Sequence, residues 1–102
     1  MLRVVERVLG EGDLTREGQR LARVGYELTL YQEWHEQCGK FIAGGFSVEG
    51  LFVAPPHALE PALGTAAPLP LHMDDGRAWQ CYVVNTDGLV TPADEQGFVR
   101  TD

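Results

Sequence analysis

Glycine and proline interrupt this chain at short intervals along its whole length. The 102 residues include 12 glycines and 6 prolines. They divide the sequence into pieces of about 5–12 residues, a spacing that suits short strands joined by turns better than long helices. The spacing of glycine and proline therefore favours an all-β sandwich or barrel.

The clearest alternation of apolar and polar side chains lies in residues 20–34, RLARVGYELTLYQEW. A period of two is typical of a strand with one face buried in an antiparallel sheet. The predicted buried face carries Val24, Tyr26, Leu28 and Leu30. Gly25 lies on the opposite face, where we expect a bulge or a bend.

Residues 68–84, PLPLHMDDGRAWQCYVV, form two alternating runs joined through Asp75–Gly76. An Asp-Gly pair between alternating strands is typical of a type I′ hairpin turn, in which both central residues have positive φ. We therefore predict a tight hairpin at Asp75–Gly76. Trp79 shares a face with Cys81 and Val83, which predicts that its large apolar ring anchors the core.

The other segments predict a strand, a loop, a second stranded region, a short helix and one or two final strands. In that order they cover residues 2–9, 35–40, 41–53 and 54–64, and then 89–93 and 96–100. Residues 41–53 are either two short strands or one strand broken at Gly44–Gly45, and a helix is the alternative for residues 2–9.

Together these elements predict an all-β fold, namely a small antiparallel β-barrel or rolled sheet of about six strands with one short helix. We expect the strands to follow mostly meander order, and closure into a barrel to remove exposed sheet edges. We expect one domain over residues 1–102, because a chain of this length buries one core. An α+β domain with helical residues 2–9 is the alternative.

The charge of the chain bears on its partners. Eight basic residues against 15 acidic residues give a net charge of −7, which argues against nucleic acid or an anionic membrane surface as a partner. The opening MLRVVERVLG carries charges within its apolar stretch, unlike a secretory signal. Two cysteines, Cys38 and Cys81, are too few for a disulfide framework, so we expect free thiols in the cytoplasm.

The sequence offers little catalytic chemistry. Ser47 is the only serine, and Glu49 occupies the position where a nucleophile elbow requires glycine. His35 and Cys38 have the spacing of half a zinc site, but no second pair follows. We therefore expect no enzyme activity, no metal and no cofactor.

One arrangement of motifs resembles a known family. Arg16 and Arg20 form an R-x-x-x-R segment before the long predicted strand, and Ser47 and Gly50 form an S-x-x-G ahead of the run LFV. This order is similar to that of PilZ domains, over about residues 16–98. One departure is Gly45, which stands where the family has aspartate or asparagine. The segment from His72 to Trp79 also resembles a hairpin of uncharacterised small bacterial domains.

The PilZ resemblance implies a non-catalytic β-barrel that binds cyclic di-GMP. Arg16 and Arg20 would hold the phosphates and guanines, and Ser47 and Gly50 would form the barrel wall beside the ligand. Arginine suits this task because its planar guanidinium donates paired hydrogen bonds to phosphate and stacks on bases.

The sequence therefore predicts a non-enzymatic β-barrel domain that binds a protein partner or a small ligand. A PilZ-like cyclic di-GMP receptor is the first alternative, and a small enzyme without a recognisable motif is the second. A homodimer is left open.

Overall fold

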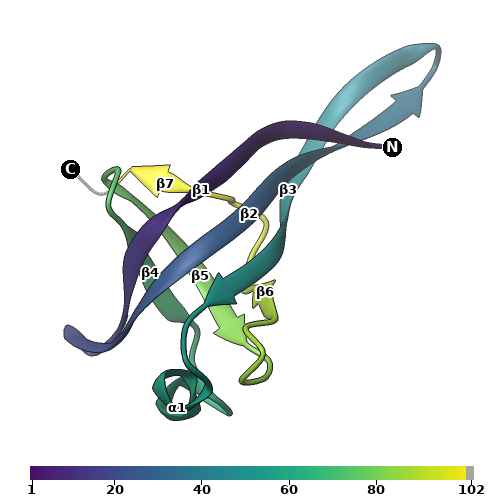
Figure 1. Ribbon diagram of the computed structural model, residues 1–102. Helices are drawn as coiled ribbons and strands as arrows, with labels where there is room; N and C mark the ends of the chain where they lie inside the picture. Colours follow the sequence, from purple (N-terminus) through teal and green to yellow (C-terminus); the bar gives the residue numbers. More distant parts are fainter. Residues whose placement is uncertain (101–102) are drawn as a thin grey trace.

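The computed structural model describes residues 1–100 and consists almost entirely of strands (Figure 1). The strands are β1 (Leu2–Arg16), β2 (Gln19–Gln37), β3 (Lys40–Val53), β4 (Leu69–Met73), β5 (Arg77–Val83), β6 (Val90–Pro92) and β7 (Val99–Arg100). One helical turn, α1 (Pro56–Leu59), continues into a 3-10 turn over Glu60–Ala62. The all-β prediction with one short helix is confirmed, and residues 2–9 belong to a strand.

The strands form one antiparallel sheet in the order β3-β2-β1-β4-β5-β6, with β7 paired to β5. β4 follows β3 in the chain but lies beside β1, where Leu14 pairs with Leu71. Three hairpin-connected strands followed by a fourth beside the first make a Greek key. The expected meander is therefore interrupted once, at the connection through α1, and the sheet curls into a half-barrel.

The free edge of β3 is covered by the chain that surrounds β6. Leu51 forms a bridge with Leu89, and the backbone N–H of Phe52 donates to the carbonyl of Gly88 over 2.8 Å. Further along, the Phe46 N–H donates to the Glu95 carbonyl over 2.9 Å. These bonds draw the two ends of the curled sheet together and satisfy backbone groups that an edge strand would otherwise expose.

The structure has tight two-residue turns between β1 and β2 and between β2 and β3, rather than at the predicted position Asp75–Gly76. Glu17 and Gly18 join β1 to β2 with φ of 53° and 81°, and Cys38 and Gly39 join β2 to β3 with φ of 54° and 77°. Positive φ at both central residues is the type I′ geometry whose twist matches paired strands.

The Asp75–Gly76 hairpin exists, but its loop has three residues. The Gly76 N–H donates to the Met73 carbonyl over 3.0 Å, and of the three loop residues only Gly76 has positive φ, at 90°. This is a turn centred on Asp74 and Asp75, followed by a left-handed glycine. The type I′ assignment was wrong because Asp74 joins the loop rather than ending β4.

Three further details differ from the sequence prediction. The segment read as a loop, residues 35–40, is strand apart from its two turn residues, and residues 41–53 belong to the single strand β3. The ladders pass through Gly25 without a register shift, so no bulge occurs there. One shift instead falls between Gln32 and Trp34, opposite Gly44–Gly45.

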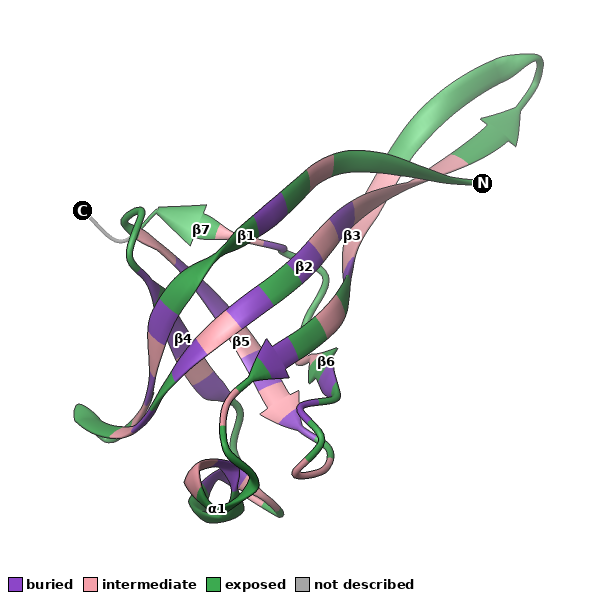
Figure 2. Cartoon of the chain, in the orientation of Figure 1, coloured by how far each residue is buried: buried purple, intermediate pink, exposed green. Residues whose placement is uncertain are grey.

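The core lies on the concave face of the curled sheet (Figure 2). All four residues of the predicted β2 face, Val24, Tyr26, Leu28 and Leu30, are buried. Trp79 is 1% exposed and meets the rings of Phe52 and Phe98 edge to face, with centroids 6.3 and 6.2 Å away. The indole therefore joins β5 to β3 and to the C-terminal segment. Its Nε1–H has no partner among the described residues.

The outer parts of β1, β2 and β3 extend beyond this core as an arm (Figure 2). We define the arm as residues 1–7 with the hairpin of residues 31–46; it makes the molecule 50 Å long against 29 and 24 Å in the other directions. Its side chains are mostly exposed or half-buried, including the apolar Phe41 and Ile42 near the hairpin turn.

Replacing Trp79 with alanine should lower the free energy of unfolding by about 3–5 kcal/mol, because truncating a buried tryptophan leaves a cavity. Urea denaturation followed by circular dichroism measures this change. Val84→Ala is the control, since Val84 is about half exposed. Equal stability of the two variants would contradict the assignment of Trp79 to the core.

Gly88→Ala should destabilise the fold far more than Gly18→Ala. Both glycines have positive φ, so both substitutions strain the backbone, but only at Gly88 would the new Cβ collide with the Phe52 carbonyl. We expect an extra loss of about 1–3 kcal/mol from this overpacking. Thermal unfolding of the two variants measures the difference, and similar melting temperatures would show that the closure at Gly88 does not contribute to stability.

Candidate functional site

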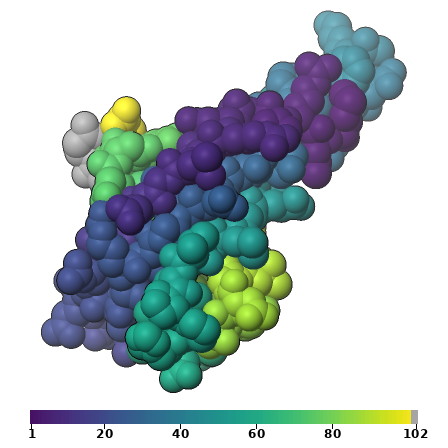
Figure 3. All heavy atoms as spheres, in the orientation of Figure 1, coloured from purple at the N-terminus to yellow at the C-terminus, as the bar shows by residue number. Residues whose placement is uncertain are grey.

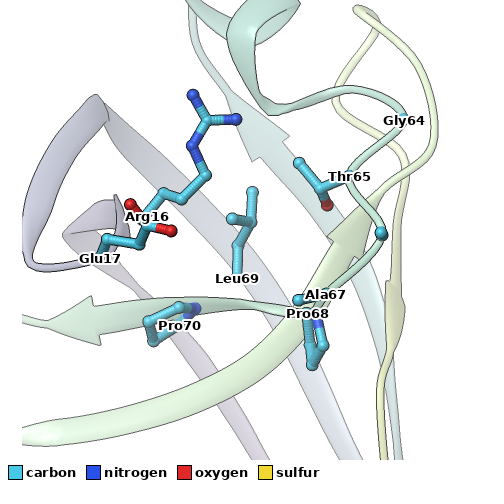
Figure 4. A pocket seen from close by; sticks show the side chains of 9 residues that line it. Arg16, Glu17, Gly64, Thr65, Ala67, Pro68, Leu69 and Pro70 are labelled. Atoms are coloured by element: carbon cyan, nitrogen blue, oxygen red, sulfur yellow. The ribbon is translucent and has the colours of Figure 1, made fainter.

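A hollow of about 410 Å³ lies between the β1–β2 turn and the segment that leads into β4 (Figure 4). It is lined by Arg16, Glu17, Gly64, Thr65, Ala66, Ala67, Pro68, Leu69 and Pro70. This volume falls within the range of small-molecule sites, about 300–1,000 Å³. The hollow also contains Arg16, the first arginine of the R-x-x-x-R segment.

The local sequence explains how the chain forms the two walls of this hollow. β1 ends at Arg16, and the tight turn at Glu17–Gly18 then fixes where the Arg16 side chain leaves the sheet. On the other side, Gly64 has a φ of 65° and turns the chain away from the 3-10 turn. Pro68 and Pro70 then favour extended backbone, because proline fixes φ and restrains the residue before it.

The charge of Arg16 is not neutralised inside the molecule. Its guanidinium makes no ion pair or hydrogen bond within residues 1–100. Arg20, the other arginine of the R-x-x-x-R segment, lies 3.6 Å from the Asp13 carboxylate. Arg23 is paired with Asp74 as well as Asp13, and these contacts raise its pKa. Among Arg16, Arg20 and Arg23, the three arginines near the β1–β2 turn, Arg16 is therefore the one that no carboxylate of the described residues engages.

The opposite wall of the hollow is mainly apolar. Figure 4 shows the buried Leu69 side chain between those of Arg16 and Thr65, with Ala67 and Pro68 beside Thr65. The Thr65 hydroxyl oxygen is buried and has no hydrogen-bond partner in the described part of the chain. A cation facing alanine, proline and leucine side chains fits a ligand with an anionic group and an apolar body.

Ser47 and Gly50 lie apart from the two arginines. They line a second hollow, of about 590 Å³, between β3 and β6. Gly50 pairs with Leu28 on β2, eight positions after Arg20, which corresponds to about 26 Å along an extended strand. A Cβ at Gly50 would collide with the Glu27 carbonyl, so close strand packing already explains this glycine. The structure brings the four residues into two groups of two.

A second charged cluster, which the sequence analysis did not identify, joins β1 to the β4–β5 hairpin. The Arg77 guanidinium donates to Glu6 over 2.7 Å and to Asp75 over 2.6 Å, and it lies 5.2 Å from the Phe98 ring centroid. Hydrogen bonds from Arg77 lower the pKa of the Asp75 carboxyl. Because the Arg77 guanidinium is engaged by Glu6 and Asp75, this cluster connects β1 to the β4–β5 hairpin.

The residues considered for catalysis are dispersed. No group of three histidine, cysteine, aspartate or glutamate side chains within residues 1–100 is arranged to hold a metal ion. Cys38 is exposed in the β2–β3 turn, whereas Cys81 is buried in the core, and burial raises the pKa of its thiol to about 12. Trp34 lies on the arm and Trp79 in the core, so the aromatic residues do not gather at the Arg16 hollow.

Comparisons with known proteins add no assignment: no protein-family model matches the chain, nor does any curated protein or solved structure. Among the described residues, no helix is long and apolar enough to cross a membrane.

The two thiols should differ sharply in reactivity. At pH 8, iodoacetamide should alkylate Cys38 and leave Cys81 unmodified, because the thiolate is the nucleophile and Cys81 is both inaccessible and protonated. Mass spectrometry should show one adduct on the native protein and two in denaturant. Two adducts at equal rates under native conditions would contradict the burial of Cys81.

Proposed function

We propose that this chain is a non-enzymatic binding domain whose Arg16 hollow takes a small ligand with an anionic group joined to an apolar body. The observation that carries the proposal is the unpaired Arg16 guanidinium at a 410 Å³ hollow with a largely apolar wall. The free thiols of Cys38 and Cys81 fit a reducing compartment, and we include a cytoplasmic location in the proposal.

The net charge of −7 bears on the range over which an anionic ligand can be attracted. An acidic chain does not attract anions over long distances, and salt screens charges beyond about 10 Å. Recognition would therefore depend on direct contact with Arg16, whose guanidinium can donate two parallel hydrogen bonds to a carboxylate or phosphate. The apolar wall would contribute affinity for the rest of the ligand.

Cyclic di-GMP remains the specific ligand implied by the family resemblance. Arg16 and Arg20 lie on the same hairpin, which supports this alternative, but Ser47 and Gly50 line the other hollow. A PilZ-like mode would therefore need the ligand to contact both regions, and it would depend on Arg20 as well as Arg16. Dependence of binding on Arg20 therefore distinguishes a PilZ-like cyclic di-GMP site from a small-ligand site that uses Arg16 alone.

The test is a titration monitored by NMR with three probes: phenyl phosphate, uncharged benzyl alcohol and cyclic di-GMP. We expect phenyl phosphate to shift the amide signals of Ala66 and Ala67 with a dissociation constant of about 1 mM, typical of a weak fragment. Arg16→Gln should weaken binding about tenfold, because hydrogen bonds to a charged group contribute more than neutral ones. Benzyl alcohol should bind more weakly than phenyl phosphate.

Two variants serve as controls. Lys40→Gln removes one positive charge at the far end of the arm and should leave binding unchanged. Arg20→Gln should matter only for cyclic di-GMP in the PilZ-like mode. Two results would refute a ligand site in this hollow. One is that no probe changes the amide signals of residues 64–70, and the other is that phenyl phosphate binds Arg16→Gln as tightly as the parent chain.

A further inference from the structure

We propose that the free edge of β1 is a self-association site, at which two copies of this chain pair their β1 strands antiparallel and join their sheets. The inference goes beyond ligand binding, because it concerns residues 2–11 of β1 and the Arg16 hollow lies at the opposite end of that strand.

The first observation is that only the C-terminal part of β1 has a strand on each side, because β4 does not extend along its N-terminal part. β4 pairs with β1 only from Gly12 to Leu14, and the last bond toward the β4–β5 hairpin runs from the Asp74 N–H to the Glu11 carbonyl over 3.0 Å. From Leu2 to Gly10, β1 is paired with β2 on one side and with no strand on the other within residues 1–100. A row of backbone donors and acceptors is thus left open to another strand.

The second observation is that large apolar side chains along this edge are exposed. Leu9 is 77% exposed, and Leu2, Val4 and Val5 are each about half exposed. Figure 3 shows the first residues of the chain, in purple, lying along the surface of the molecule. The stretch contains no proline and no lysine, two residues that commonly protect edge strands from pairing, although it carries Arg3, Glu6 and Arg7 and one register shift between Val4 and Glu6.

The distribution of charge favours a second copy in antiparallel orientation. The beginning of the edge carries Arg3, whose guanidinium stacks 5.8 Å from the Trp34 ring and makes no ion pair within the described chain. At the other end, three carboxylates, those of Glu11, Asp13 and Asp74, surround Arg23, which leaves negative charge in excess. An antiparallel pair brings the positive end of each strand to the negative end of the other, twice by symmetry.

A hollow at the negative end provides space for this contact. It measures about 490 Å³ and lies where β1 and the β4–β5 hairpin separate. Its charged lining residues are Glu11, Asp74 and Asp75 against one arginine, Arg7. In the antiparallel pair, Arg3 of the partner subunit would reach this hollow. Unlike charges at an interface set orientation and register, and the backbone bonds of the added strand supply affinity.

The experiment measures the oligomeric state by sedimentation equilibrium, with far-UV circular dichroism to confirm that each variant is folded. We expect the parent chain to dimerise and Leu9→Lys to weaken dimerisation at least about tenfold, because a lysine blocks an edge without removing a buried side chain. Val53→Lys is the matched control, since Val53 is similarly exposed but lies on β3. It should dimerise like the parent.

A charge exchange tests the orientation. Arg3→Glu and Glu11→Lys should each weaken the dimer about tenfold, and the double variant should recover most of the loss, because the two charges meet across the interface. A parent chain that is still monomeric at a concentration of about 1 mM would overturn the proposal, because a dimer with a higher dissociation constant would not form at ordinary protein concentrations. A dimer that tolerates Leu9→Lys, or a double variant that shows no recovery, would overturn it equally. None of these outcomes depends on the Arg16 titration.

Discussion

The first three strands are 15, 19 and 14 residues long, whereas the four strands that fold against them have 5, 7, 3 and 2 residues. The short strands can cover only part of the long ones, because a core needs two apolar surfaces of matching size. Where they overlap, β2 buries one complete face. Beyond the overlap the same ladders continue without a covering layer, and they form the arm and the open edge of β1.

Two arginines mark the border between the covered and uncovered regions. Arg23 joins β1 and β2 to the β4–β5 turn through Asp13 and Asp74, and Arg77 joins that hairpin to β1 through Glu6. Exposed ion pairs stabilise a protein only modestly, and Arg23 is well exposed. Arg77 is only 18% exposed, so its pairs are screened less. Together these contacts fix the position of the hairpin along β1, which determines where the two strands separate.

The sequence predicted the fold best where burial imposed a pattern. The alternation at Val24, Tyr26, Leu28 and Leu30 identified β2 because one face had to be apolar. The same reasoning failed for residues 35–40, since a strand without a core beneath it has no reason to alternate. The turn at Asp75–Gly76 was recognised, but its type depended on whether Asp74 paired or turned, a choice made by the register of β4 and β5.

The candidate site was predictable only in part. Arg16 was singled out through a family motif, and the structure places it at a hollow. The other wall, residues 64–70, could not be inferred, because it lies beside Arg16 only after the Greek key connection has returned the chain to β1. A site assembled from segments about fifty residues apart leaves no local periodicity in a sequence.

That connection also has a kinetic meaning. The β1–β2, β2–β3 and β4–β5 pairs are hairpins, which form in microseconds because their partners are neighbours in the chain. The pairing of Leu14 with Leu71 must instead close a loop of more than fifty residues, and its entropic penalty grows with the logarithm of loop length. Among these strand pairs, the contact made through the Greek key connection therefore has the largest loop-closure entropy to overcome. In any conformation that lacks this contact, the apolar face of β2 loses the β4–β5 layer that covers it and is exposed to water and to other chains.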